Sequence, residues 1–205
     1  GAPDPERLKR QFTAIVEQAD RINTIINHVR RFGRRDTEGP TPFDPVASTR
    51  SAILMSNHQL ESAGICLRNE LPETGPLVLG HPARFEQVII NLMTNAIDAI
   101  VGAEGRTVLA GMGTITVSAF EDPAAGTVTV RIEDDGPGIP AEVRDRLFDP
   151  FFTTKPPGKG TGLGLSISLG IVAEMGGRID VPVLDGGARI DVILPVQREV
   201  AQAET

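Results

Sequence analysis

The sequence predicts an α+β sandwich preceded by one long helix. Three observations predict this fold. A long helical pattern opens the chain, helical and strand patterns then follow in blocks, and two alternating runs at 114–120 and 127–133 are joined by a Pro-Ala-Ala-Gly turn. With 205 residues, 40% of them apolar and 23% charged, the chain is long enough to bury a core. Disorder or a bare coiled coil is therefore excluded for the whole chain.

The first pattern predicts an amphipathic helix over residues 6–33. Its apolar or small residues are spaced alternately by four and three, which is a heptad seam kept for three heptads. The seam consists of Leu8, Phe12, Ile15, Ala19, Ile22, Ile26 and Val29. A seam this narrow must pack against another helix. We expect that partner to be another chain, a segment outside this sequence or the domain that follows.

The later patterns predict one domain joined to this helix by a linker. Residues 36–45 hold three prolines and one glycine, which is typical of a linker. Helices are expected at 45–63, 82–101 and about 163–175, and strands at 64–71, 76–79, 114–120, 127–133, 177–183 and 188–194. The expected organisation is a helix over 1–35, the linker over 36–45, a domain over 46–196 and a polar tail over 197–205.

Composition excludes several classes of function. The net charge of −7 and the absence of Trp and Tyr argue against a nucleic-acid binder, which needs cations for phosphate and aromatic rings for stacking. The lone cysteine, Cys66, cannot form an internal disulfide and fits a reducing, cytoplasmic compartment. No apolar run approaches the roughly 18 residues of a membrane span, so we expect this segment to make no membrane contact.

The helix expected at 82–101 carries an amide face. Asn91, Asn95 and Asp98 are spaced so that they share one side of the helix, and Gln87 falls on the same side one turn earlier. A polar helix face is often only a solvent face, but such faces usually carry Lys and Glu. Amide oxygens without charge suit a site for a hard cation or a phosphate.

A carboxylate follows the strand expected at 127–133. Asp134 opens the sequence Asp-Asp-Gly-Pro-Gly, which as an isolated motif is typical of an acidic turn. The functional interpretation is a carboxylate at a strand end that accepts a hydrogen bond from an exocyclic amine. The glycines would let a ring approach the backbone.

The stretch Phe148-Asp149-Pro150-Phe151-Phe152-Thr153-Thr154-Lys155 cannot be a regular helix or strand, because Pro150 interrupts it. The stretch predicts either a loop whose phenylalanines pack into the core or a hinged lid. In the second case the phenylalanines would anchor the lid, and Lys155 and Lys159 would lie at its moving end.

A glycine-rich loop then leads into the next helix. Gly160, Gly162 and Gly164 come just before or at its start, where free backbone N–H groups favour phosphate. The loop is neither a P-loop nor a dinucleotide fingerprint, since it lacks the required spacing and does not follow a strand. By itself it is a weak signal, because glycine loops at helix starts are common.

Together and in this order, the four segments resemble the N, G1, F and G2 boxes of sensor histidine kinases. The resemblance covers about residues 40–195 and implies the catalytic domain of that family, in the superfamily of gyrase, heat-shock chaperone, histidine kinase and MutL. It implies a Bergerat fold, a two-layer α/β sandwich in which helices cover a mixed sheet. The helix over 6–33, which ends in IINHVRRFGRR, is similar to the second helix of the family's dimerisation and phosphotransfer hairpin.

The resemblance implies ATP and Mg²⁺ as ligands. Asn95 would hold Mg²⁺ against the triphosphate, Asn91 would contact phosphate or metal, and Asp134 would accept a hydrogen bond from the adenine amino group. The other residues that it implies in nucleotide binding are Asp98, Gly136, Gly138, Ile139, Lys155, Lys159, Gly160, Thr161, Gly162, Leu163, Gly164 and Leu165. Its implied partners are a response regulator receiver domain and a second copy of the chain, paired through the helical hairpin.

Two departures from the family's pattern bear on the nucleotide pocket. Asp98 stands where many members carry Lys, and Arg189 stands where Thr or Ser is usual near adenine. Arg189 would either crowd the pocket or point away from it. These departures keep open a degenerate kinase that serves only as an interaction module.

The phosphoacceptor pattern of the family, a His followed by an acidic residue and then a Pro, is absent. His28, His58 and His81 each lack it. We therefore expect a kinase domain that binds ATP, does not phosphorylate itself, and transfers the γ-phosphoryl to a histidine on a helix not present in this chain.

Two other ATP-dependent classes fit less well. A gyrase B or mismatch-repair ATPase carries a general-base Glu where this chain has Asn91, and an amide cannot take a proton from water. A serine-directed anti-sigma kinase would not need the heptad helix.

Overall fold

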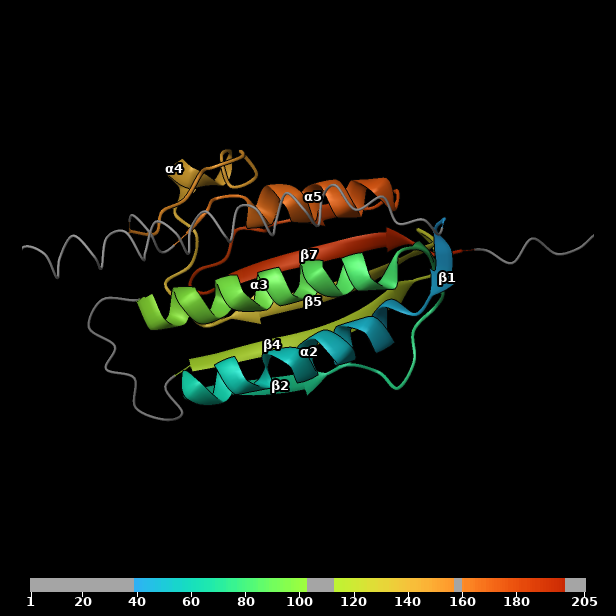
Figure 1. Cartoon of the computed structure of the whole chain (residues 1–205), viewed down its shortest axis with the longest axis horizontal. Helices are drawn as coiled ribbons and strands as arrows, with labels where there is room; N and C mark the ends of the chain where they lie inside the picture. The colour runs from blue at the N-terminus through green and yellow to red at the C-terminus, as the bar shows by residue number, and fades with distance from the viewer. Residues whose placement is uncertain (1–38, 103–112, 157–159, 198–205) are drawn as a thin grey trace, which may run out of the picture.

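The computed structural model describes residues 39–102, 113–156 and 160–197, and it confirms the α+β sandwich. A five-stranded sheet forms one layer, and α2, α3 and α5 lie side by side across one of its faces (Figure 1). The helix expected over 6–33 and the tail from 198 lie outside the described residues. The elements are β1 (Thr41–Phe43), α2 (Pro45–Ser62), β2 (Ile65–Glu70), β3 (Val78–Gly80), α3 (Pro82–Gly102), β4 (Gly113–Asp122), β5 (Thr127–Asp134), α4 (Ala141–Arg144), α5 (Gly164–Glu174), β6 (Arg178–Asp180) and β7 (Ala188–Pro195).

The sheet is mixed, with strand order β2-β4-β5-β7-β6. β2 and β4 run parallel, and the other neighbouring pairs are antiparallel. β4 and β5 form the expected hairpin, in which Asp122 pairs with Thr127 across the turn. The register of β5 on β7 places Asp134 opposite Ala188 and Glu133 opposite Arg189, so alternate residues of the two strands face opposite sides of the sheet.

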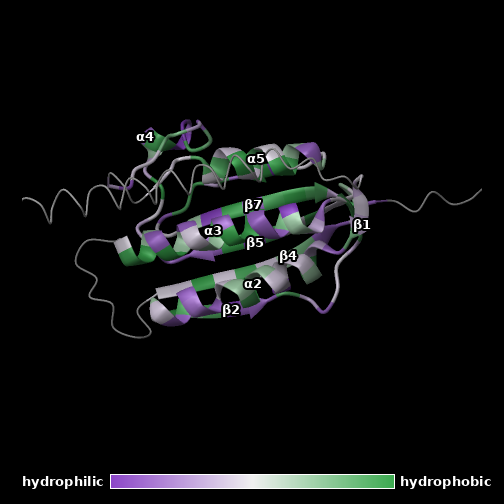
Figure 2. Ribbon diagram, viewed as in Figure 1, coloured by the Kyte–Doolittle hydropathy of each residue, from purple (hydrophilic) through white to green (hydrophobic). Residues whose placement is uncertain are grey.

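The helices begin and pack as their sequences dictate. Asp44 caps α2, since its Oδ1 accepts the backbone N–H of Val46 at 2.7 Å, and Pro45 occupies the first helical position. α3 alternates between hydrophobic and hydrophilic residues along its length (Figure 2). Its apolar side is buried against the sheet and the flanking helices, with Phe85, Val88, Ile89, Leu92, Met93, Ala96, Ile97 and Ile100 in the core.

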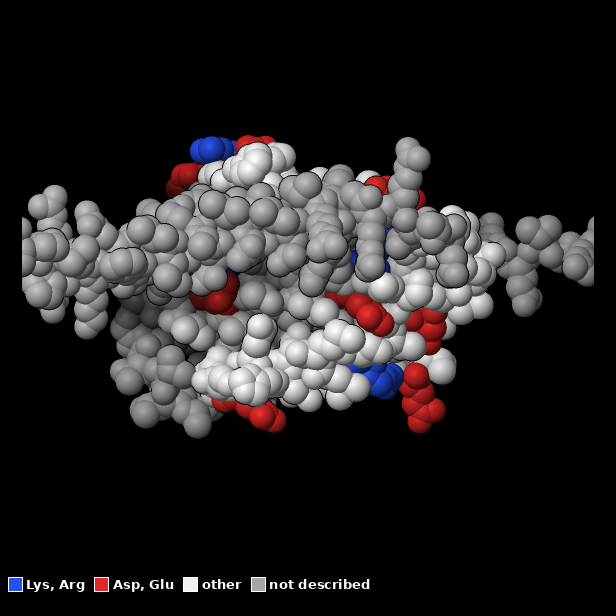
Figure 3. Space-filling model, in the orientation of Figure 1, with Lys and Arg blue, Asp and Glu red and all other residues white. Residues whose placement is uncertain are grey.

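The outer side of α2 carries two exposed apolar residues. Leu54 and Met55 are 66% and 64% exposed. On the face of the molecule seen in Figure 3, the side chains over the middle of α2 are mostly uncharged. Among the described helices, none has the length and apolarity needed to cross a membrane.

Two expectations about the connecting segments need correction. Thr41–Phe43, inside the range expected for the linker, form β1, which pairs antiparallel with β3 in a separate two-stranded sheet. This pairing spans almost forty residues, so local sequence carries no sign of it. β2 and β3, which follow each other in the sequence, therefore belong to different sheets. Between β5 and α5, where the sequence predicts no helix, the chain forms the short helix α4, which has no buried residue.

Candidate nucleotide pocket

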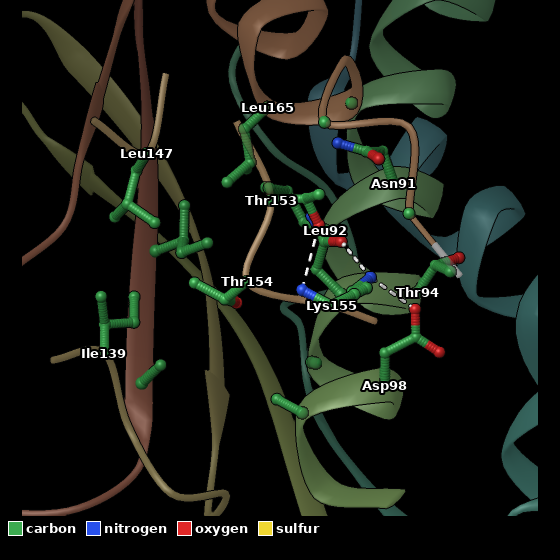
Figure 4. Close-up of a pocket in the computed structure, with 18 of the residues that line it drawn as sticks. Asn91, Leu92, Thr94, Asp98, Ile139, Leu147, Thr153, Thr154, Lys155 and Leu165 are labelled. Atoms are coloured by element: carbon green, nitrogen blue, oxygen red, sulfur yellow. Dashed lines mark hydrogen bonds and ion pairs between the residues drawn. The ribbon is translucent and has the colours of Figure 1, made fainter. Parts of the chain in front are cut away.

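One cavity of about 830 Å³ lies between α3, the N-terminal end of α5, the facing ends of β5 and β7, and the segment around α4. Most residues that the sequence singled out line this cavity, although they come from four separate stretches of the chain. They are Asn91, Asn95, Asp98, Asp134, Gly138, Ile139, Lys155, Gly160, Thr161, Gly162, Gly164 and Leu165. Figure 4 shows side chains from α3 and from the segment before α5 pointing into the same space.

Three of the predicted residues stand differently. Gly136 and Leu163 adjoin the cavity without lining it. Gly136 donates its N–H to Asp134, and Leu163 is the N-cap residue of α5. Lys159 lies outside the described residues.

The amide face of α3 forms one wall of the cavity. Asn91, Asn95 and Asp98 all line it, and Gln87 lines it one turn earlier. Asn91 is fixed by α5, because its Nδ2 donates to the buried Oγ of Ser168 at 3.0 Å. Sequence reasoning missed Ser168. Its signal is its position, one helical turn after Gly164 and therefore on the same side of α5.

Asp134 lines the cavity from the sheet, where β5 ends. Its side chain is half-buried, and its Oδ1 accepts the backbone N–H of Gly136 at 2.9 Å. Burial raises the pKa of this carboxyl, while hydrogen bonds from the backbone of Gly136 and Ala188 partly oppose the rise in pKa. A desolvated carboxylate is a strong acceptor for an N–H donor that enters the cavity.

Arg189 does not enter the pocket. It alternates with Ala188 and Ile190, which do line the cavity, so its side chain lies on the other face of the sheet. There its Nε donates to Glu133 at 2.8 Å. Of the two alternatives for Arg189, the structure supports the one in which it points away.

Close approach of α5 to α3 explains the glycine at the start of α5. A Cβ on Gly164 would collide with Oδ1 of Asn91, so a side chain there would force Asn91 to shift and would disturb its hydrogen bond to Ser168. Gly162 adopts a φ of +66°, and a Cβ there would lie 2.3 Å from the carbonyl carbon of Phe151. Both glycines therefore serve tight packing, and the second brings the Phe segment onto the start of α5.

The Phe segment, residues 148–156, is anchored by two of its three phenylalanines. Phe148 packs against the core, and Phe152 lines the cavity with the guanidinium of Arg146 over its ring at 4.4 Å. Phe151 is 70% exposed and has a φ of +67°, a costly conformation for a bulky residue. The expectation that all three rings anchor this segment is therefore wrong for Phe151. Its backbone N–H instead donates to Gly162 at 2.9 Å.

Lys155 crosses from the Phe segment to α3. Its Nζ donates to Oδ2 of Asp98 at 2.6 Å and to Oδ1 of Asn95 at 3.2 Å (Figure 4). Two acceptor oxygens on consecutive turns of α3 thus face one positive charge. Within the described residues, no group of three or more His, Cys, Asp or Glu could hold a metal ion. The oxygens of Asn95 and Asp98 are of the type that Mg²⁺ prefers, but a metal ion here would need further ligands from a bound molecule.

Fold and pocket define a two-layer α+β domain whose ligand site lies between a central helix, a glycine-rich helix start and the end of a strand. Residues 80–198 match the family described as histidine kinase-, DNA gyrase B- and HSP90-like ATPase. The chain belongs to this family, and its resemblance to sensor histidine kinases is confirmed.

Individual relatives agree with this assignment. The chain is 34% identical over 193 residues to the two-component sensor PprA of Pseudomonas aeruginosa, covering 94% of this chain and 20% of that protein. The catalytic domain of histidine kinase ThkA has a TM-score of 0.65 and 29% identity, covering 78% of this chain and 97% of that domain. A structure of ThkA in complex with the response regulator TrrA has a TM-score of 0.70 and 26% identity, covering 96% of this chain and 53% of that chain.

These comparisons identify the domain as the ATP-binding catalytic domain of a histidine kinase. The chain spans only about a fifth of the length of PprA.

The contact between α3 and α5 predicts different effects for two glycines of α5. Gly164→Ala should lower the free energy of unfolding by about 1–3 kcal/mol, because the new methyl group collides with Asn91. Gly170→Ala is the matched control, since a Cβ at Gly170 meets open space and alanine favours the helix by up to about 1 kcal/mol. Urea denaturation measures both changes. Equal stability of the two variants would contradict the close contact.

Burial of Asp134 predicts a pH-dependent stability. Because its pKa in the folded state is raised above the ordinary value of 3.8, the group favours folding most below pH 3.8, and this contribution is lost as the pH rises through the folded-state pKa. Asp134→Asn removes the titration. The stability of this variant relative to the natural chain should therefore improve as the pH rises across that window. Urea unfolding over a pH series measures this difference, and a constant difference would refute it.

Proposed function

We propose that this domain binds ATP with Mg²⁺ and transfers the γ-phosphoryl group to a histidine on a helix that is not present in this chain. The observation that carries the proposal is the convergence of the α3 amides, the Asp134 carboxylate and the glycine-rich start of α5 on one cavity. These groups are chemically suited to the two ends of a nucleoside triphosphate.

Asp134 would contact the base of the nucleotide, and the α3 amides would contact its phosphates. The carboxylate of Asp134 would accept a hydrogen bond from the adenine amino group, with Gly136 and Gly138 shaping that side of the pocket. Ile139 adds an apolar contact for the ring. Asn91 and Asn95 would face the phosphates from α3. The phosphates would also face the start of α5 and the loop before it, where the dipole of the helix favours negative charge. The backbone there belongs to Gly160, Thr161, Gly162 and Gly164.

Transfer of a phosphoryl group requires mainly positioning and neutralisation of charge. Mg²⁺, when bound, would neutralise charge on the triphosphate. Asn95 offers it an oxygen, and Lys155 adds a positive charge at the same end of the cavity. Lys159 would supply another charge from the same segment of sequence. Leu163 and Leu165 would fix the start of α5 that cradles the phosphates.

Asn91 favours transfer over hydrolysis by this site. Its position is one helical turn before Asn95, where the related ATPases need a general base. An amide cannot accept a proton from water, and the Nδ2 of Asn91 already donates to Ser168.

The partners and the location that we propose for this domain follow from its family and its sequence. Relay to an aspartate of a response regulator is supported by the structure of ThkA with the response regulator TrrA. Pairing of two chains through the helical hairpin is supported by the heptad seam over 6–33. We place the domain in the cytoplasm, consistent with the single cysteine, Cys66.

Calorimetric titration with ADP and a non-hydrolysable ATP analogue tests the site. Asp134→Asn should weaken binding at least tenfold, because a hydrogen bond to a charged group is worth about 1.5–3 kcal/mol. Asn95→Ala should reduce the gain in affinity that Mg²⁺ gives and leave metal-free binding nearly unchanged.

Glu133→Gln is the matched control for Asp134→Asn. Glu133 precedes Asp134 on β5, but its carboxylate pairs with Arg189 on the other face of the sheet. This variant should bind nucleotide as the natural chain does. Absence of binding by the natural chain at millimolar nucleotide would contradict the proposal and leave a domain that serves only in protein interactions.

A further inference from the structure

The ion pair between Lys155 and α3 has a geometry that simple charge neutralisation of Asp98 does not require. The ammonium group is shared by a carboxylate oxygen of Asp98 and the amide oxygen of Asn95. These two residues are three positions apart on α3, so their side chains point to the same side. Both oxygens therefore face one point in the cavity, and a positive charge already occupies it.

The oxygens of Asn95 and Asp98 at this point form an incomplete magnesium site. Mg²⁺ is commonly held by one or two protein oxygens, with phosphate oxygens and water completing its shell. Here Asn95 and Asp98 offer an amide and a carboxylate oxygen beside the proposed phosphate end of the pocket. An ammonium is a compact point charge that uses the same oxygens as a hard cation, so the two cannot occupy the point together.

The rest of Lys155 is held against its own segment. Its backbone N–H donates to Oγ1 of Thr153 at 3.2 Å. Gly160 packs against the lysine stem so closely that a Cβ there would lie 3.2 Å from the lysine Cδ. The side chains of Lys155 and Asp98 nevertheless remain 29% and 42% exposed. An ion pair with this much solvent contact is weak enough to exchange its partner.

We propose that the ammonium of Lys155 and the Mg²⁺ of a bound nucleotide are alternative occupants of one cation position formed by Asn95 and Asp98. In this proposal Asp98 is a second protein oxygen for the metal. Lys155 is a resident cation that neutralises Asp98 until the metal replaces it. The proposal rests on the proposed function, since the metal arrives with the nucleotide.

Exchange explains why a carboxylate is present beside the phosphates. An unpaired Asp98 would repel a polyphosphate, whereas an Asp98 that always carries a cation does not. With the metal in place, the ammonium of Lys155 leaves this position and loses its carboxylate partner.

The test is the magnesium gain, defined as the affinity for ADP with saturating Mg²⁺ divided by the affinity with excess chelator. Calorimetry gives both values for each variant. Lys155→Gln should raise the gain about twofold to fivefold, because the metal no longer displaces an ion pair of the strength usual for exposed pairs. Asp98→Ala frees the lysine as well, but it removes a metal ligand at a cost of about tenfold. Its magnesium gain should therefore fall by about twofold to fivefold.

Arg178→Gln is the matched control. It removes one positive charge from β6, where Arg178 pairs with Asp180 and does not line the cavity. Its magnesium gain should equal that of the natural chain. A general effect of net charge would instead move Arg178→Gln and Lys155→Gln together, which would overturn the proposal.

The proposal requires the magnesium gain to rise in Lys155→Gln and to fall in Asp98→Ala. An unchanged or lower gain in Lys155→Gln overturns the exchange of cations. A raised gain in Asp98→Ala shows that Asp98 only positions the lysine, which also overturns it. If the natural chain binds ADP and these signs fail, only this inference falls. If it binds no nucleotide under either condition, the proposed function falls as well.

A second measurement follows the lysine directly. The chain has three lysines, Lys9, Lys155 and Lys159, so the ¹³Cε signals of labelled lysine can be assigned by substitution. Addition of Mg²⁺ to the ADP complex should shift the Lys155 signal toward the position that this signal has in the Asp98→Ala variant. In that variant the lysine has no carboxylate partner. A signal that stays unchanged contradicts displacement.

Discussion

The close contact between α3 and α5 is the constraint on which the pocket depends. Gly164 lies against Asn91 with no room for a side chain, and Ser168 accepts a hydrogen bond from the same asparagine one turn later. This contact aligns the amide face of α3 with the start of α5. Without it the glycine-rich loop before α5 and the amides of α3 would not face one shared cavity.

The sheet supplies the other wall through strict alternation. On β5 and β7, Asp134 and Ala188 belong to the cavity side, whereas Glu133 and Arg189 pair on the far side. Arg131 and Asp191 form a two-pronged ion pair on that far side, with both bonds at 2.8 Å. Hydrogen bonding to Asp191 raises the pKa of Arg131. The charged pairs of the sheet are thus kept away from the pocket, whereas the half-buried carboxylate of Asp134 faces into it.

Much of the fold could be predicted because the long patterns determine it locally. The spacing of Phe85, Val88, Ile89 and Leu92 predicts α3, and alternation predicts β4 and β5. β1 could not be predicted, because a three-residue strand containing Pro42 forms only through its pairing with β3. α4 has only four residues and buries none of them, so it leaves no pattern of apolar residues in the sequence.

The residues of the pocket could be predicted from four motifs, but three features of its geometry could not be predicted without the tertiary structure. The side to which Arg189 points depends on strand register. The hydrogen bond between Asn91 and Ser168 depends on how closely two helices approach. The pairing of Lys155 with Asp98 joins residues that are 57 positions apart, and the unusual carboxylate acquires its partner only there.

A crystal structure of this chain with Mg²⁺ and a non-hydrolysable ATP analogue would test the central claim most directly. The account predicts the adenine amino group within hydrogen-bond distance of Asp134 and the phosphates between α3 and the start of α5, with the metal ion on Asn95. Nucleotide bound elsewhere, or adenine held by residues other than Asp134, would contradict it.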